Sequence, residues 1–178
     1  DVWLLVGAGC SFPSVPLAAT IIDDIRAAYP EHCESLSEYP SYMEVMGVLS
    51  TLQRKQRIGQ DLAGAKVNTE CLAIASLIAA NKVTRVYTTN FDPLILQACA
   101  FIGKLPFVYD LAAYGGSQDA LLQREDLATP CLVYLHGQQE GFVVATTAEE
   151  TKAVTSKVER LWDFRKSTWI VAGYSGEN

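Results

Sequence analysis

Basic charge is scarce in this 178-residue sequence. Lysine and arginine total 14 against 20 aspartates and glutamates, which gives a formal net charge of −6. This balance argues against direct nucleic-acid binding by the domain, because phosphate backbones are bound by clustered Lys and Arg side chains. Hydrophobic residues make up 49% of the chain and charged residues 19%, which predicts a globular fold of one domain.

Paired cysteines are missing as well. The five cysteines are odd in number and form no Cys-x-x-Cys pair: Cys10, Cys33, Cys71, Cys99 and Cys131. Their spacing disfavours a structural zinc site and a disulfide framework, so we expect no metal. Isolated cysteines with apolar neighbours are typical of a reducing compartment, which predicts a cytoplasmic protein.

Long apolar runs are also absent. The longest candidate, Cys71 to Ala80, is interrupted by Ser76 and bounded by Glu70 and Asn81, so we expect no membrane association. No basic region precedes the apolar residues at the N-terminus, as a signal peptide would require. We expect residues 1–178 to be a single domain trimmed at both ends.

What the sequence does have is a series of short apolar runs that alternate with helical patterns. This alternation predicts an α/β domain with a Rossmann-like, doubly wound parallel sheet. The expected strands are Val2–Val6, Val83–Thr88, Pro106–Tyr109, Cys131–Leu135 and Thr168–Ala172, with a short hairpin or edge strand at Gly141–Thr147. The expected helices flanking them are Leu17–Tyr29, Leu94–Ala100 and Ala148–Phe164.

An inserted block with a helical pattern occupies about residues 31–82. It is longer than a crossover needs, so it is expected to form a small helical cap over the sheet. Within it, the polar stretch Gln53 to Gln60 is interpreted as a helix end or loop. Asn68 or Thr69 is a candidate N-cap for a second helix, Glu70 to Ala80.

A glycine turn follows the first expected strand. Glycines in Gly7-Ala8-Gly9 would let the backbone approach a pyrophosphate, and the hydroxyl of Ser11 could reach a phosphate oxygen. Phe12 stands where the third glycine of the dinucleotide fingerprint would be. The alternative is a tight turn without a ligand, in which Ser11 is an ordinary loop or cap hydroxyl.

Asn90 and Asp92 follow the second expected strand, which should end beside the first. An amide there could hold a ribose hydroxyl or a water, and a carboxylate could accept a hydrogen bond from nicotinamide. The alternative for Asp92 is an Asx turn that caps the helix opened by Pro93. The two roles are compatible with each other.

His136 ends a later strand and precedes Gly137. Its ordinary pKa, about 6.5, suits proton transfer near neutral pH, although a histidine at a strand end can also be a simple polar terminus. His32, the other histidine, is expected at the surface. Gly173 and Ser175 close the last visible strand, where glycine allows close approach and serine a hydrogen bond; Gly176 would permit an unusual turn.

Taken in order, these strings resemble the sirtuin superfamily, and most nearly the sirtuin-like NAD-consuming domains of bacterial antiphage-defence proteins. The resemblance implies that NAD is the substrate and that the bond between nicotinamide and ribose is cleaved. Asn90 would hold the nicotinamide ribose or a water, Asp92 the carboxamide, and His136 would be the base. The phosphate loop would comprise Gly7, Ala8, Gly9 and Ser11, while Gly173 and Ser175 would contact the diphosphate or adenosine ribose.

Two departures favour NAD hydrolysis over protein deacylation. Deacylases of the superfamily carry a zinc module with two cysteine pairs, which this sequence cannot build. They also have a Pro-Asp-Phe-Arg string after the glycine loop, where this chain has Pro16-Leu17-Ala18-Ala19. The resemblance further implies a fused or associated sensor domain and self-association. The alternatives are an NAD or ADP-ribose sensor without turnover and an NAD-dependent deacylase.

Overall fold

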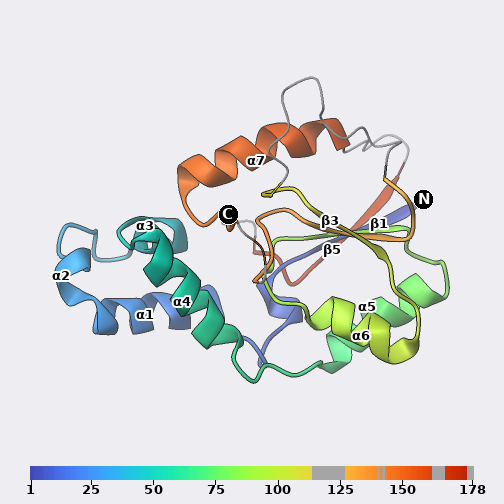
Figure 1. Ribbon diagram of the computed structural model, residues 1–178, viewed down its shortest axis with the longest axis horizontal. Helices are drawn as coiled ribbons and strands as arrows, with labels where there is room; N and C mark the ends of the chain where they lie inside the picture. Colours follow the sequence, from blue (N-terminus) through green and yellow to red (C-terminus); the bar gives the residue numbers. More distant parts are fainter. Residues whose placement is uncertain (114–126, 140, 142, 162–166, 176–178) are drawn as a thin grey trace.

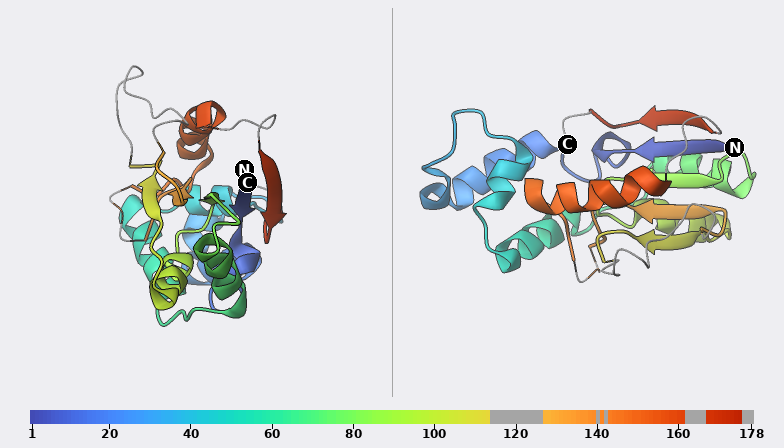
Figure 2. Two further views of the ribbon diagram at one scale, coloured as in Figure 1. Left: turned by 90° about the vertical axis from the view of Figure 1, so that its right-hand side faces the viewer. Right: turned by 90° about the horizontal axis from the view of Figure 1, so that it is seen from above.

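The computed structural model describes residues 1–113, 127–139, 141, 143–161 and 167–175, with backbone only for 156–161. Its centre is one sheet of five parallel strands in the order β3-β4-β2-β1-β5. The strands are β1 (Val2–Val6), β2 (Arg85–Thr88), β3 (Phe107–Asp110), β4 (Cys131–Tyr134) and β5 (Thr168–Ala172). Seen from above, β5 and β3 form the two edges (Figure 2). The predicted α/β class with a parallel sheet is confirmed.

Helices cover both faces of this sheet. In Figure 1, α5 (Thr69–Ala79) and α6 (Leu94–Ile102) lie below it and α7 (Ala148–Leu161) lies above it. Successive strand residues point to opposite faces, so Leu4 and Val86 belong to the core with α5 and α6, whereas Trp3 belongs to the core with α7. This two-sided burial explains why the inner strands β2 and β4, buried at every residue, are continuous apolar runs.

The register of the strands brings three strand ends into one row. Val6 lies opposite Thr88, and Thr88 lies opposite Tyr134. The loops that leave β1, β2 and β4 therefore start side by side at the carboxyl edge of the sheet. In parallel α/β sheets this edge is where ligands bind.

A helical cap, defined here as residues 18–62, stands beside this carboxyl edge (Figures 1 and 2). It consists of α1 (Ala18–Ala28), α2 (Pro30–Cys33), α3 (Tyr42–Gly47) and α4 (Thr51–Leu62). The cap has its own buried core, formed by Ile25, Val45, Met46, Leu49 and Ile58. The helical block anticipated from the sequence thus divides in two, because α5 packs with α6 under the sheet and not in the cap.

The interpretation of Gln53–Gln60 as a helix end or loop was wrong, because these residues lie inside α4. Ser50 is the N-cap: its Oγ accepts from the backbone N–H of Gln53, while the Gln53 side chain accepts from the N–H of Ser50. This reciprocal capping box starts the helix. The polar residues that follow form its solvent-facing side, with Ile58 buried on the other.

A strand or hairpin within Gly141–Thr147 was also wrong for the described part of that segment, which is irregular. One backbone hydrogen bond, from Ala145 N to the carbonyl of His136, ties it to the end of β4. Val144 packs instead against the core of the helical cap. Asn68 caps α5 through its side chain, as anticipated, and residues 162–164 of the expected last helix lie outside the described residues.

All five cysteines are free thiols in the structure. Within the ranges that the structure describes, no His, Cys, Asp or Glu residues gather in a way that could hold a metal ion. None of the described helices combines the length and the apolar character needed to cross a bilayer.

Candidate functional site

A pocket of about 790 Å³, counted to its open mouth, lies between the carboxyl edge of the sheet and the helical cap. Four of the residues singled out in the sequence for polar chemistry line it: Ser11, Asn90, Asp92 and His136. They follow β1, β2 and β4, so the aligned strand ends bring them together from distant parts of the chain. Ala8 lies at the same pocket.

A buried hydrogen-bond network joins the first two of these segments. Ser11 Oγ donates to Asp92 Oδ2 at 2.7 Å, and Asn90 Nδ2 donates to Ser11 Oγ at 3.0 Å. Asn90 Nδ2 also donates to the carbonyl of Gly7 at 3.1 Å. The side chain of Asn90 is thereby fixed against the glycine turn, and the network holds the segments after β1 and β2 in one arrangement.

Asp92 forms the Asx turn that the sequence left open, although it is not the N-cap of α6, a position that Pro93 occupies. Its Oδ1 accepts from the backbone N–H of Leu94 at 3.0 Å, at the start of α6, and its carbonyl accepts from the hydroxyl of Tyr134. Burial raises the pKa of Asp92, and this effect outweighs the hydrogen bonds from Ser11 and Leu94, which lower it. Ionisation of this carboxyl group beside the pocket therefore costs free energy.

His136 lies two residues after the end of β4 and is partly buried. Burial lowers the pKa of its imidazole, which is neutral at neutral pH. The ring of Phe91 stands next to it, with centroids 6.4 Å apart. Among the residues that the structure describes, neither ring nitrogen has a hydrogen-bond partner, so the imidazole can accept a proton from a group in the pocket.

The glycine turn is packed against the chain after β5. A Cβ at Gly7 would meet the carbonyl oxygen of Gly173 at 2.6 Å, and one at Gly9 would meet Gly173 Cα at 2.9 Å. Gly7 N donates to the carbonyl of Ala172, and Gly9 N donates to that of Gly173. This close packing accounts for both glycines without a ligand, and a role for Gly7 and Gly9 toward a pyrophosphate stays a prediction.

The remaining predicted residues stand apart from the pocket. Gly173 has a φ of +63° and closes on the turn at Cys10, while Ser175 is exposed beyond it, and neither lines the pocket. Gly176 lies outside the described residues. Roles for Gly173 and Ser175 toward a diphosphate or ribose stay predictions.

The helical cap supplies the opposite wall; the cap itself was expected from the sequence, but the residues that line the pocket from it were not predicted. Tyr42, Met43, Ile58 and Asp61 line the pocket from α3 and α4. Short motifs next to glycine turns identify strand-end residues, but a wall built from an amphipathic insertion has no local signature. The Ser50 and Gln53 capping box was a signal that could have placed the start of α4 correctly.

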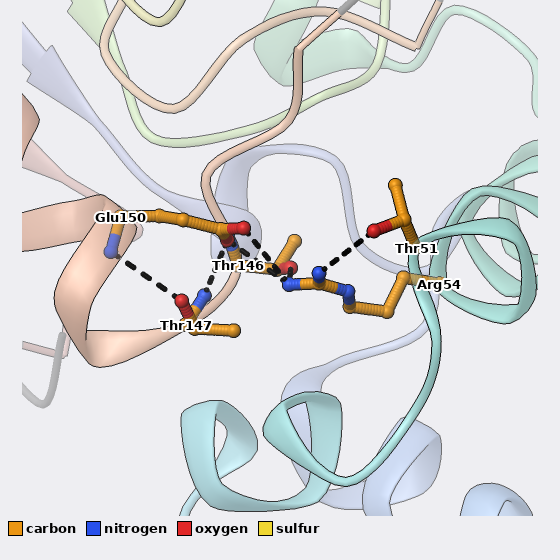
Figure 3. Close-up of polar contacts among 5 residues, drawn as sticks. All are labelled: Thr51, Arg54, Thr146, Thr147 and Glu150. Carbon is orange, nitrogen blue, oxygen red and sulfur yellow. Dashed lines mark hydrogen bonds and ion pairs between the residues drawn. The ribbon is translucent and has the colours of Figure 1, made fainter.

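Arg54 joins the helical cap to the start of α7 (Figure 3), next to Thr146, which lines the pocket. Its Nη1 lies 3.0 Å from Glu150 Oε2 and donates to Thr146 Oγ1 at 3.1 Å. Glu150 Oε2 also accepts from the backbone N–H groups of Thr146 and Thr147 at the start of α7. The Glu150 carboxylate thus accepts hydrogen bonds from the backbone at the start of α7 and pairs with Arg54 of the helical cap. These contacts fix the position of Thr146 at the pocket.

Comparison with known proteins adds no family to this geometry, since no protein-family model matches the chain and no curated protein matches its sequence.

Proposed function

We propose that this domain is an NAD hydrolase that cleaves the bond between nicotinamide and ribose in the pocket between sheet and helical cap. One observation carries the proposal: Ser11, Asn90, Asp92 and His136, which the motifs nominate separately, line one pocket at the carboxyl ends of β1, β2 and β4. The resemblance to sirtuin-like NAD-consuming domains assigns chemistry to the same residues. NAD is the substrate in this reaction, and no metal takes part in the proposal.

The chemistry uses the protonation state that burial gives His136. As the bond to nicotinamide lengthens, positive charge moves from the pyridinium ring to the ribose, and nicotinamide leaves as a neutral base. A water positioned by Asn90 adds to the ribose carbon and loses its proton to neutral His136. The products are nicotinamide, ADP-ribose and one proton. Asp92 supplies negative charge near the developing cation.

The proposed biological setting follows the same resemblance. An enzyme that consumes NAD in the cytoplasm would act as the effector of an antiphage-defence protein, held silent by a fused or associated sensor domain until triggered. Self-association is a second route to control. Within the domain, the sheet and the helical cap meet at the pocket, so a partner bound to the cap would act directly on the site.

The test is nicotinamide release from NAD by the full-length protein, measured by chromatography together with Asn90→Ala and His136→Ala. Release by the wild type that both variants abolish supports the proposal. A thermal shift with NAD but no nicotinamide, even after assembly or triggering, would assign an NAD sensor instead. Release that requires an acyl-lysine peptide would assign a deacylase.

A further inference from the structure

Tyr42 presents a hydroxyl to the pocket from the helical cap. It is the first residue of α3, which a capping box between Ser41 and Glu44 starts. Its ring packs against the core of the cap, and the residue lines the pocket. Within the described part of the chain, no hydrogen bond to this hydroxyl is formed. A largely covered phenol without a partner is one that a ligand can satisfy.

Asp61 lies at the same wall, on the last turn of α4. Its carboxylate is held by Arg57, whose Nε donates to Oδ2 at 3.0 Å and whose Nη2 donates to Oδ1. Arg57 Nη2 is also 2.9 Å from Asp24 Oδ2 on α1. A bidentate pair anchored to a second helix fixes the orientation of the carboxylate, which still has lone pairs for further donors.

The charge of Asp61 adds to burial in raising the pKa of the Tyr42 hydroxyl, although Arg57 opposes the effect. Tyr42 is therefore protonated at neutral pH and can donate a hydrogen bond. Asp61, in contrast, can only accept one. The wall thus offers one donor and one acceptor that belong to neighbouring side chains.

The charges around the pocket restrict what can lie against this wall. Asp61 and Asp92 both line the pocket, whereas no lysine or arginine is among its described lining residues. A phosphate placed there would face the carboxylates of Asp61, which is paired with Arg57, and Asp92, with no lysine or arginine among the described lining residues to bind it. The group that fits is uncharged and both accepts from a phenol and donates to a carboxylate. A pair of vicinal sugar hydroxyls has both properties.

We propose that Tyr42 and Asp61 bind the hydroxyls of a ribose of the substrate, so that the helical cap supplies the sugar-binding half of the site. This inference rests on the proposed function and adds to it a substrate-binding role for residues outside the predicted motifs. The cap is then part of the site and not only a cover. Substrate affinity depends on how it sits against the sheet.

The experiment measures NAD binding by calorimetry and nicotinamide release by the full-length protein, for the wild type and Tyr42→Phe. The variant keeps the ring and removes one hydroxyl, so we expect Kd and KM to rise roughly three- to tenfold with kcat nearly unchanged. Tyr39→Phe is the matched control, because Tyr39 is also in the cap and is 85% exposed. It should match the wild type.

A second readout is inhibition by nicotinamide, which has no sugar. Tyr42→Phe should leave this inhibition unchanged if the hydroxyl binds ribose. Weaker inhibition would place the contact on the carboxamide and overturn the assignment. Unchanged Kd and KM in Tyr42→Phe, with an active wild type, would overturn this inference alone. A wild type that neither binds nor cleaves NAD would overturn the proposed function and this inference with it.

Discussion

The hydroxyl of Ser11 donates a 2.7 Å hydrogen bond to the carboxylate of Asp92, 81 positions away in the sequence. Ser11 follows the glycine turn after β1, and Asp92 follows β2, so the contact joins the two strand ends at the centre of the sheet. Asn90 donates to the same hydroxyl. Every residue of this network either lines the pocket or supports one that does, which makes its energetics directly testable.

Asp92→Asn should abolish NAD cleavage without destabilising the fold at neutral pH. Burial raises the pKa of Asp92 above its value in the unfolded chain, so the folded protein loses stability as the pH rises through the folded-state pKa. Asparagine cannot ionise, and its Oδ1 can still accept from Leu94 N. Urea unfolding at pH 7 should give a free energy equal to or above that of the wild type.

The difference in free energy of unfolding between Asp92→Asn and the wild type should shrink as the pH is lowered toward about 4, near the unfolded-state pKa of aspartate. In that range the wild-type carboxyl is protonated in the folded state and no longer carries the cost of a buried charge. A variant less stable than the wild type by more than about 1 kcal/mol at pH 7 would contradict this account, since it would mean that hydrogen bonds to the carboxylate outweigh its desolvation.

His136→Ala should lower kcat/KM for NAD about a hundredfold or more, the usual cost of losing a general base. Because burial lowers the pKa of His136, the wild-type rate should stay level through neutral pH and fall only below about pH 6.5. His32→Ala is the control, because His32 is exposed on α2, and it should leave the rate unchanged. A rate that declines with an apparent pKa above 7 would argue against neutral His136 as the base.

Gly173→Ala and Gly59→Ala should have opposite effects on stability. A Cβ at Gly173 would lie 2.4 Å from Cys10 N, and φ there is +63°, a conformation that alanine adopts only with strain. We expect a loss of several kcal/mol or failure to fold. Gly59 is inside α4 with nothing within 4 Å of an added Cβ, so alanine should stabilise by about 0.5–1 kcal/mol. Thermal unfolding of both variants tests the packing of the glycine turn.

Arg54→Gln and Glu150→Gln should each weaken the attachment of the helical cap. Arg54 and Glu150 interact at 3.0 Å with partial burial on the Arg54 side, so each change should cost about 1–3 kcal/mol. Because both remove the same contact, the double variant should be less destabilised than the sum of the two, as a double-mutant cycle would measure. Strict additivity would show that the two residues act independently. We also expect KM for NAD to rise, since Thr146 is part of this contact and of the pocket.

The strands could be predicted from the sequence because each is a short apolar run; β2 and β4 are buried throughout, whereas the edge strands β3 and β5 are partly exposed. β1 and β5 were predicted with the bounds that the structure has. α4 was missed because its exposed Gln, Arg and Lys residues resemble a loop, although such residues favour helices. The apolar residues at 143–145 suggested a strand, but Val144 is apolar because it packs against the helical cap.

Part of the site could also be predicted. Parallel strands end at one edge, so the motifs after β1, β2 and β4 were expected to converge, and their residues line one pocket. The Ser11–Asp92 hydrogen bond could not be foreseen, because it depends on the conformations of two loops and on their position relative to each other. The close packing of Gly7 against Gly173 could not be foreseen either. A glycine in the sequence does not indicate whether a ligand or a neighbouring backbone segment excludes the side chain.

Phe91 lies between Asn90 and Asp92 in sequence and lines the same pocket, but its packing partners differ. Its neighbours belong to the buried network beside the sheet, whereas Phe91 packs against the core of the helical cap. Residues 90–92 therefore connect the end of β2 to the helical cap. A tilt of the helical cap would move Phe91 and, through the backbone, both Asn90 and Asp92. A partner that binds the outer face of the cap would therefore change the position of the pocket's polar residues through one short segment.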